Sequence, residues 1–181
     1  MPLLMECERN TVGLGTEEAV KPLRVCFVCT GNTCRSPMAE AVTHAIAQKN
    51  VASLPESIKA FTVPRIEADS AGLYPVQGEP ISHGACAALE RDGVQPTPDH
   101  DYHNHRARLL ALQQVERADL LVGMTSRHAM ELLLRFPQAA SKIVCMPEEI
   151  VDPYGGDEEA YFTCLQQIKK GVQSLLADYL L

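Results

Sequence analysis

The amino-acid sequence predicts an α/β fold in which a four-stranded parallel sheet lies between helices on both faces. Short apolar runs rich in β-branched residues alternate along the chain with longer segments of helical periodicity. This alternation is typical of parallel sheets, because each crossover between parallel strands needs a long connection, usually a helix. A chain of 181 residues is long enough for one well-buried domain and short for two.

The first strand is LRVCFVC, residues 23–29, and it follows an extension, residues 1–22, that has no clear periodicity. A TGNTCR loop then leads into a helix, with Ser36 as its expected cap and Pro37 as its first residue. The later elements are expected to be a loop (51–64), a strand (65–72), helices (81–92 and 107–116), a strand (118–124), a helix (126–136), a strand (142–146) and a last helix (158–180). The sequence therefore predicts one domain, residues 23–181, after an N-terminal arm of uncertain order.

Composition and charge exclude several classes of protein. The formal net charge of −7 argues against nucleic acid or an anionic membrane as the main partner. No apolar run is long enough to span a bilayer, and the N-terminus lacks the pattern of a secretory signal. Seven irregularly spaced cysteines suit free thiols in a reducing compartment. We therefore expect a cytoplasmic protein, and the oligomeric state is not predicted.

The segment Cys29–Ser36 is the candidate active site, because ligands of such folds bind where parallel strands end. A loop running from a strand into a helix can direct several backbone N–H groups at one anion. Gly31 would permit the backbone angles that the loop demands, and Arg35 offers a planar fork for two phosphate oxygens. In this field Cys29 would favour its thiolate form and could attack a bound phosphoryl group.

Specific motifs surround this loop. The spacing C-x5-R followed by serine differs from the nucleotide-binding loop, which needs GKS or GKT. The segment CTGNTCRSPMAEA resembles the signature of the low-molecular-weight protein tyrosine phosphatase family, and ADSAG, HRAR, ADLLVGMT and VDPYGGD resemble later family motifs in the same order. The resemblance extends from about residue 23 to the C-terminus.

The resemblance implies a flavodoxin-like three-layer fold, no metal or organic cofactor, and a phosphorylated protein or peptide as substrate. It also implies that Cys29 is the nucleophile, that Arg35 holds the phosphoryl group and that Asp152 is the general acid and then the base. Ser36 would donate a hydrogen bond to the thiolate. The implied phosphate-binding residues are Thr30, Gly31, Asn32, Thr33, Cys34, Arg35 and Ser36. The residues that resemble the family's supporting network are Asn32, Ser36, Ser70 and His105. Asp152 could instead cap the following helix.

The remaining cysteines and histidines have simpler interpretations. Cys26 lies within a strand, whereas a redox or zinc CxxC normally lies in a turn, so we expect core packing. Cys34 is either a small filler or, as in some family members, a partner that forms a protective disulfide with the nucleophile. Cys86, Cys145 and Cys164 are most simply core residues. The spacing of His100, His103 and His105 fits no common zinc pattern, and we expect His105 to be structural and the other two to be solvated.

Thr33 bears on the substrate. Family members that prefer phosphotyrosine commonly carry isoleucine here, and a branch resembling bacterial protein arginine phosphatases carries threonine, whose hydroxyl can accept from a guanidinium N–H. Tyr154 is expected at the pocket mouth, where Gly155 leaves room. These features favour phosphoarginine, with phosphotyrosine and unselective aryl phosphates as alternatives.

Two other classes of protein share features of this loop. An arsenate reductase would need two further, closely spaced cysteines, which the sequence after Cys86 does not offer. A phosphocarrier or redox sensor would not need both Arg35 and Asp152. The sequence therefore indicates a phosphoprotein phosphatase.

Overall fold

The computed structural model describes residues 21–53 and 65–180, and it contains the predicted parallel sheet. The strands are β1 Leu23–Cys29, β2 Ile66–Gly72, β3 Leu120–Gly123 and β4 Ile143–Cys145. Their order across the sheet is β2-β1-β3-β4, and every neighbouring pair is parallel. The expected fold class is therefore confirmed.

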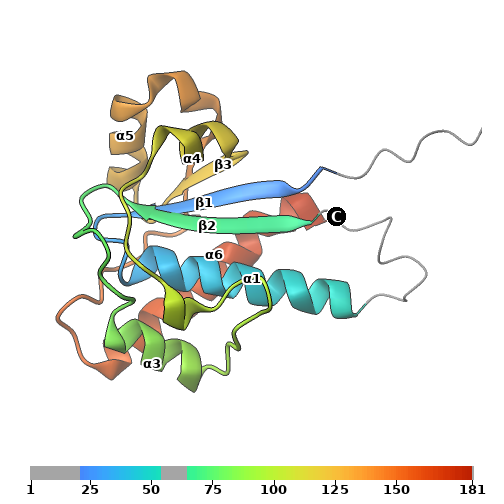
Figure 1. Ribbon diagram of the computed structural model, residues 1–181, viewed down its shortest axis with the longest axis vertical. Helices are drawn as coiled ribbons and strands as arrows, with labels where there is room; N and C mark the ends of the chain where they lie inside the picture. The colour runs from blue at the N-terminus through green and yellow to red at the C-terminus, as the bar shows by residue number, and fades with distance from the viewer. Residues whose placement is uncertain (1–20, 54–64, 181) are drawn as a thin grey trace, which may run out of the picture.

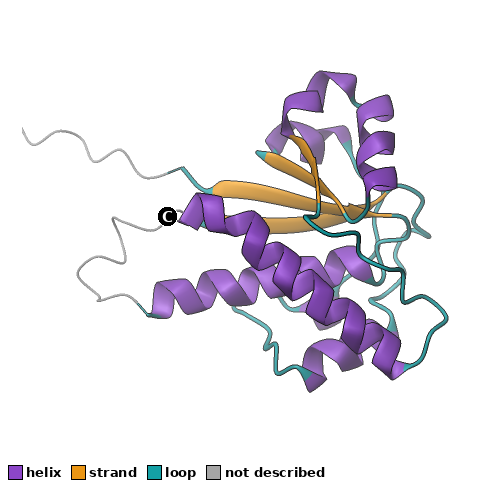
Figure 2. Cartoon of the chain, turned by 180° about the vertical axis from the view of Figure 1, so that it is seen from behind, coloured by secondary structure: helices purple, strands orange, loops and turns teal. Residues whose placement is uncertain are grey.

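Helices cover both faces of the sheet, as Figures 1 and 2 show. They are α1 Arg35–Ala52, α3 His83–Arg91, α4 Leu112–Arg117, α5 Ser126–Arg135 and α6 Glu158–Leu180, with 3-10 turns η1 Tyr102–Asn104 and η2 Pro137–Lys142. Helices α1, α3 and α6 form one layer, and α4 and α5 form the other (Figure 1).

The core is divided by β1, whose residues are buried on both faces of the sheet. Val25, Phe27 and Cys29 belong to the cluster on the α1–α6 side. Cys26 and Val28 belong to the cluster on the α4–α5 side. Successive side chains of a strand point to opposite faces of the sheet. Because helices cover both faces here, β1 needs a continuous apolar run.

Two expected elements are corrected. The first helix begins at Arg35, where the Met38 amide donates to the Cys34 carbonyl at 3.2 Å. Ser36 is therefore not the cap. The helix also continues through Ala52, so the first residues of the expected loop are helical, while residues 54–64 and 1–20 lie outside the described part of the chain.

The expected helix over residues 107–116 is only the short α4, residues 112–117. Residues 107–111 instead run extended, because Gly72 at the end of β2 offers backbone partners. The Gly72 amide donates to the Arg108 carbonyl at 2.8 Å, and the Leu110 amide donates to the Gly72 carbonyl at 3.0 Å. Across the two ranges that the structure describes, no helix is both long and apolar enough to cross a bilayer.

Candidate active site

Cys29 ends β1, and the loop Thr30–Cys34 curls from it into α1 at the carboxyl edge of the sheet. The Cys29 side chain is buried, and its Sγ lies 3.0 Å from Ser36 Oγ. The Asn32 amide donates to the same sulfur at 3.3 Å. Both contacts fix the position of the Cys29 sulfur at the mouth of the loop.

Asn32 organises the loop. Its side-chain Nδ2 donates to Ser36 Oγ at 3.0 Å and to Ser70 Oγ at 2.9 Å. Its Oδ1 accepts from the Arg108 amide at 3.0 Å, and its carbonyl accepts from His105 Nε2 at 2.7 Å. Burial lowers the pKa of His105, which keeps the ring neutral with one N–H for this bond. The four residues expected to support the loop therefore lie together around it.

The backbone freedom expected of Gly31 is in fact required elsewhere. Asn32 has a φ of 55°, in the left-handed region where asparagine is one of the few tolerated residues. Gly31 does not have a positive φ, and a Cβ there would make only an ordinary contact with Thr33. A glycine that packs against the loop is Gly72, where a Cβ would lie 2.8 Å from the Thr30 carbonyl oxygen.

Glu40 extends this network into α1. Ser70 Oγ donates to Glu40 Oε2 at 2.6 Å, and the Glu40 side chain is almost completely buried. Burial raises the pKa of this carboxyl to about 7. Sequence reasoning missed Glu40, although it stands within the SPMAEA part of the motif.

Arg35 and Asp152 face each other across the loop. Arg35 Nη2 lies 2.6 Å from Asp152 Oδ2, and Nη1 donates to the Ile150 carbonyl at 3.4 Å. Asp152 does not cap α6, because Asp157 Oδ1 accepts from the Ala160 amide at 2.9 Å instead. The DPYGGD segment thus brings a carboxylate to the edge of the loop.

His128 is a further buried neighbour that the sequence did not reveal. Its Nε2 is hydrogen-bonded to Thr30 Oγ1 at 3.0 Å, and its Nδ1 to Thr125 Oγ1 at 2.7 Å. Burial, with the Arg35 charge, lowers the pKa of His128 to about 4. The neutral ring therefore links the residue after Cys29 to the start of α5. In the sequence, the only signal of this role is a histidine at the third position of a helix that follows a strand.

A cavity of about 220 Å³ opens above the loop. Its floor contains Cys29, Thr30, Gly31, Thr33, Cys34 and Arg35, and its rim contains Asp152, Tyr154, Tyr74, Val76 and Glu79. The last three rim residues were not predicted, because they come from the turn after β2, which no loop motif marks. Tyr74 is held in place by a hydrogen bond to Glu131 and by the Arg135 guanidinium, 4.4 Å from its ring centroid.

Cys34 lies in the loop with its thiol directed toward neighbouring helices. Its Sγ donates to Ser82 Oγ at 3.2 Å and lies 3.7 Å from the Tyr161 hydroxyl. The side chain is buried. These contacts are long and weak, as is usual for a thiol.

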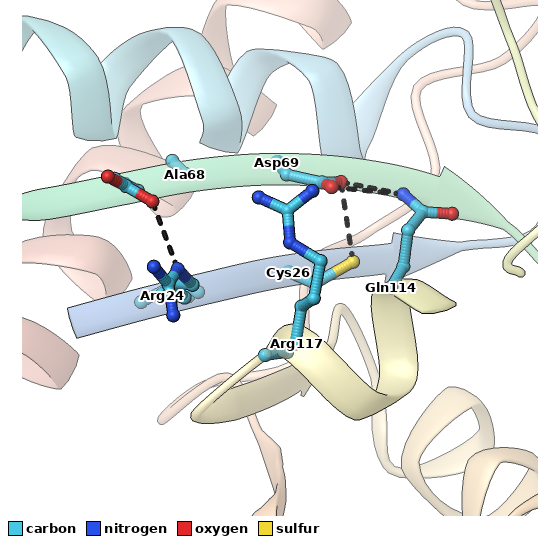
Figure 3. A pocket seen from close by; sticks show the side chains of 9 residues that line it. Arg24, Cys26, Ala68, Asp69, Gln114 and Arg117 are labelled. Carbon is cyan, nitrogen blue, oxygen red and sulfur yellow. Dashed lines mark hydrogen bonds and ion pairs between the residues drawn. The ribbon is translucent and has the colours of Figure 1, made fainter. Parts of the chain in front are cut away.

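Cys26 borders a separate hollow of about 180 Å³ on the α4 side of the sheet, shown in Figure 3. Its thiol donates to Asp69 Oδ1 at 3.6 Å, and Gln114 Nε2 donates to the same oxygen at 2.9 Å. Burial and the Asp69 charge raise the pKa of Cys26. The expectation of core packing for Cys26 is therefore confirmed.

The other cysteines and histidines differ in part from expectation. Cys164 is buried as predicted, whereas Cys86 and Cys145 are only half-buried. His103 is exposed as expected. His100 was expected to be solvated, which is wrong, because its side chain is only 13% exposed and packs against α1. The helix that covers it is distant in sequence.

Comparisons with known proteins agree with this arrangement. A family model described as low molecular weight phosphotyrosine protein phosphatase matches residues 24–180. A protein-arginine-phosphatase of Geobacillus stearothermophilus is 29% identical over 161 residues, with 85% of this chain and 94% of the relative covered. A low molecular weight protein-tyrosine-phosphatase of Streptomyces coelicolor is 32% identical over 168 residues, with 85% and 92% covered.

Solved structures give the same result. An arginine phosphatase from Geobacillus stearothermophilus matches with a TM-score of 0.70 at 30% identity, with 87% of this chain and 93% of that chain covered. A low molecular weight protein tyrosine phosphatase from T. tengcongensis matches with a TM-score of 0.73 at 30% identity, covering 86% and 99%. These relatives do not favour the arsenate reductase or phosphocarrier alternatives.

Proposed function

The chain belongs to the low molecular weight phosphotyrosine protein phosphatase family, and from this premise we propose that it removes phosphoryl groups from phosphorylated arginine side chains of proteins. The family match over residues 24–180 supports a single phosphatase domain, residues 23–181. The same premise supports a cytoplasmic setting, where such a substrate and the free thiols would both be available.

The reaction would proceed in two displacement steps on Cys29. The thiolate attacks phosphorus, the bond from phosphorus to the guanidino nitrogen breaks, and Asp152 donates a proton to the departing nitrogen. Asp152 then accepts a proton from water, whose oxygen attacks the phosphorus of the cysteinyl phosphate. The phosphorus–sulfur bond breaks, which returns Cys29 to its thiolate and releases inorganic phosphate. Arg35 and the loop N–H groups would stabilise the charge on the phosphoryl oxygens in both steps.

The observation that carries the choice of substrate is the polar lining of the cavity. Thr33 and Glu79 both border it, one with a hydroxyl group and the other with a carboxylate. The guanidinium group of phosphoarginine has N–H donors that need acceptors once they are desolvated. A hydroxyl and a carboxylate can supply them, and a phenyl ring could use neither.

A phosphotyrosine substrate is the second candidate, because the rim is also aromatic and apolar. Tyr74, Val76 and Tyr154 border the cavity, and all three side chains are more than 60% exposed. Exposed rings at a pocket mouth can stack on an aryl phosphate. The two substrates therefore depend on different walls of the same cavity.

The test compares kcat/KM on matched phosphoarginine and phosphotyrosine peptides for wild type, Thr33→Ile and Thr33→Ser. We expect wild type to prefer phosphoarginine, Thr33→Ile to shift the ratio toward phosphotyrosine at least tenfold, and Thr33→Ser to keep the wild-type ratio because it retains the hydroxyl. Cys29→Ser should abolish both activities. A wild-type preference for phosphotyrosine would overturn the substrate assignment, and turnover that does not depend on Cys29 would overturn the phosphatase mechanism.

A further inference from the structure

One face of α5 contacts the active-site cavity at two places. His128, Glu131 and Arg135 are three and four residues apart, which places them on the same face of the helix. His128 is hydrogen-bonded to Thr30 on the floor of the cavity, with Nε2 3.0 Å from Oγ1. Glu131 and Arg135 instead contact Tyr74 on the rim, in the turn after β2, which lies beside α5 in Figure 1. The helix therefore reaches both the floor and the rim.

Tyr74 is an exposed residue whose position is nevertheless fixed. Its side chain is 63% exposed. Its hydroxyl donates to Glu131 Oε1, and the Arg135 guanidinium carbon lies 4.4 Å from the centroid of its ring. Arg135 Nη1 also donates to the Leu73 carbonyl at 3.1 Å, which holds the backbone beside the ring. An exposed tyrosine would ordinarily move among several rotamers. Here two side chains of α5 hold its ring, its hydroxyl and the adjacent backbone.

Glu131 and Arg135 also bind each other. Arg135 Nη2 lies 2.5 Å from Glu131 Oε1, and the two side chains are 31% and 22% exposed. The hydrogen bond from Tyr74 lowers the pKa of Glu131, so the carboxylate stays ionised and accepts from both neighbours. Each of the three side chains therefore contacts the other two. We call Tyr74, Glu131 and Arg135 the rim clamp.

We propose that Glu131 and Arg135 are positioning residues that act on the substrate through Tyr74. They fix its ring as one wall of the cavity mouth, where the phosphorylated side chain emerges from the loop. An aromatic wall can pack against a guanidinium or a phenyl group, so the rim clamp sets how tightly the substrate side chain is held. It does not take part in the chemistry at phosphorus. The inference rests on the proposed phosphatase function, and it does not depend on the choice between the two substrates.

A purely structural role for the ion pair is the alternative, and helices α3 and α6 supply a matched example. Arg91 lies over the Phe162 ring, 3.9 Å from its centroid, and pairs with Glu159. None of these three residues lines the cavity. Arg91→Gln therefore removes the same kinds of contact as Arg135→Gln, but away from the substrate, and it is the control.

The experiment measures kcat and KM for wild type, Arg135→Gln, Tyr74→Ala, the double variant and Arg91→Gln, on whichever phosphopeptide wild type prefers. We expect Arg135→Gln to raise KM about 3- to 10-fold, the range for a lost aromatic contact, with kcat within about twofold of wild type. Arg91→Gln should change neither constant. In the Tyr74→Ala background, Arg135→Gln should have no further effect, because the ring it positions is gone.

Competitive inhibition by inorganic phosphate separates the rim from the loop. Phosphate can occupy the loop but has no side chain that reaches the rim. Its Ki should therefore be the same in wild type and Arg135→Gln. A general distortion of the active site would instead change KM and this Ki together.

Three results would overturn the proposal. These are an unchanged KM in Arg135→Gln, a parallel change of KM and the phosphate Ki, and an effect of Arg135→Gln that persists in full in the Tyr74→Ala background. Thermal denaturation shows whether each variant is folded. If Arg135→Gln does not fold, Tyr74→Phe decides the question, because it keeps the ring and loses only the hydrogen bond to Glu131. Its KM should then rise, and an unchanged KM would contradict the role of the clamp.

Failure of the substrate assignment would look different. A wild-type preference for phosphotyrosine would overturn the phosphoarginine proposal alone. The effect of Arg135→Gln on KM would still be measured, with the phosphotyrosine peptide as substrate.

Discussion

Arg35 and Asp152 form an ion pair at the active-site loop, with Nη2 and Oδ2 2.6 Å apart and side chains that are 7% and 51% exposed. The pair joins a buried cation to a half-exposed carboxylate. A phosphoryl group in the loop would compete for the same guanidinium fork, because Arg binds phosphate and carboxylate with the same geometry. Substrate binding would therefore free Asp152 from Arg35, so that its carboxyl group can take up a proton from solvent and pass it to the leaving group.

Replacing Asp152 by alanine should separate the two chemical steps. We expect kcat on a phosphopeptide to fall about 10²- to 10⁴-fold, the usual range for a lost general acid or base. An aryl phosphate with a good leaving group should still phosphorylate Cys29, so the cysteinyl phosphate should accumulate. Rapid-quench kinetics and intact-mass measurement would detect it. Asp157→Ala, which removes the helix cap in the same segment, should leave the burst pattern unchanged. The same loss in both variants would contradict the prediction.

Asn32 should be sensitive to both backbone and side-chain changes. Asn32→Ala places alanine at a φ of 55° and removes three side-chain hydrogen bonds. We expect the free energy of unfolding to fall by about 2–4 kcal/mol, the sum of left-handed strain and unsatisfied partners. Asn32→Gly also loses the hydrogen bonds, but glycine adopts a positive φ without strain. Its free energy of unfolding should therefore fall less. Urea denaturation measures both, and equal losses would show that the left-handed conformation carries no strain.

The pKa of His128 gives a pH dependence of stability. It is about 4 in the folded protein, against an ordinary value of 6.5. Between these pH values the unfolded chain binds the extra proton, so the contribution of His128 to stability is lost as pH falls through this window. Glu40 acts in the opposite sense, because its pKa is raised to about 7. The comparison of wild type with His128→Gln cancels the Glu40 effect.

We therefore expect wild type to be more stable than His128→Gln at pH 7 and the difference to shrink toward pH 4.5. Denaturant midpoints across this range measure the difference. His103→Gln is the control, because the carboxylates beside His103 raise its pKa. The difference in stability between wild type and His103→Gln should instead shrink as pH rises above 6.5. A difference in stability between wild type and His128→Gln that does not change with pH would contradict the prediction.

Cys34 is predicted to protect the nucleophile during oxidation. It stands five residues after Cys29, and its thiol is held only by contacts of 3.2 and 3.7 Å, so it can turn toward an oxidised Cys29. Wild type treated with peroxide should recover activity with dithiothreitol, and Cys34→Ser should not. Cys164→Ser is the control, because burial raises the pKa of Cys164 to about 12 and leaves little thiolate. Equal recovery of Cys34→Ser and wild type would identify Cys34 as a packing residue.

The sequence predicted the parallel sheet because β1, β3 and β4 are short, mostly apolar runs that alternate with helical segments. The resemblance of ADSAG and HRAR to family motifs also predicted that Ser70 and His105 support the loop together with Asn32. The sequence pattern misplaced the helix at residues 107–116, because the backbone of Gly72 competes for those residues and no local pattern reveals this. Local spacing carries no information about Glu79, His128 or the Glu40–His100 contact, because each depends on elements that are far apart in the chain.

The alternation of β1 has a consequence for oxidation chemistry. Cys26 and Cys29 are three residues apart, so their side chains lie on opposite sides of the sheet, in separate core clusters. The sheet itself keeps the two sulfurs from meeting, and a CxxC dithiol with a shared reduction potential cannot form without unfolding the central strand. The nucleophile can therefore follow its own redox cycle while a second thiol in the same strand remains reduced.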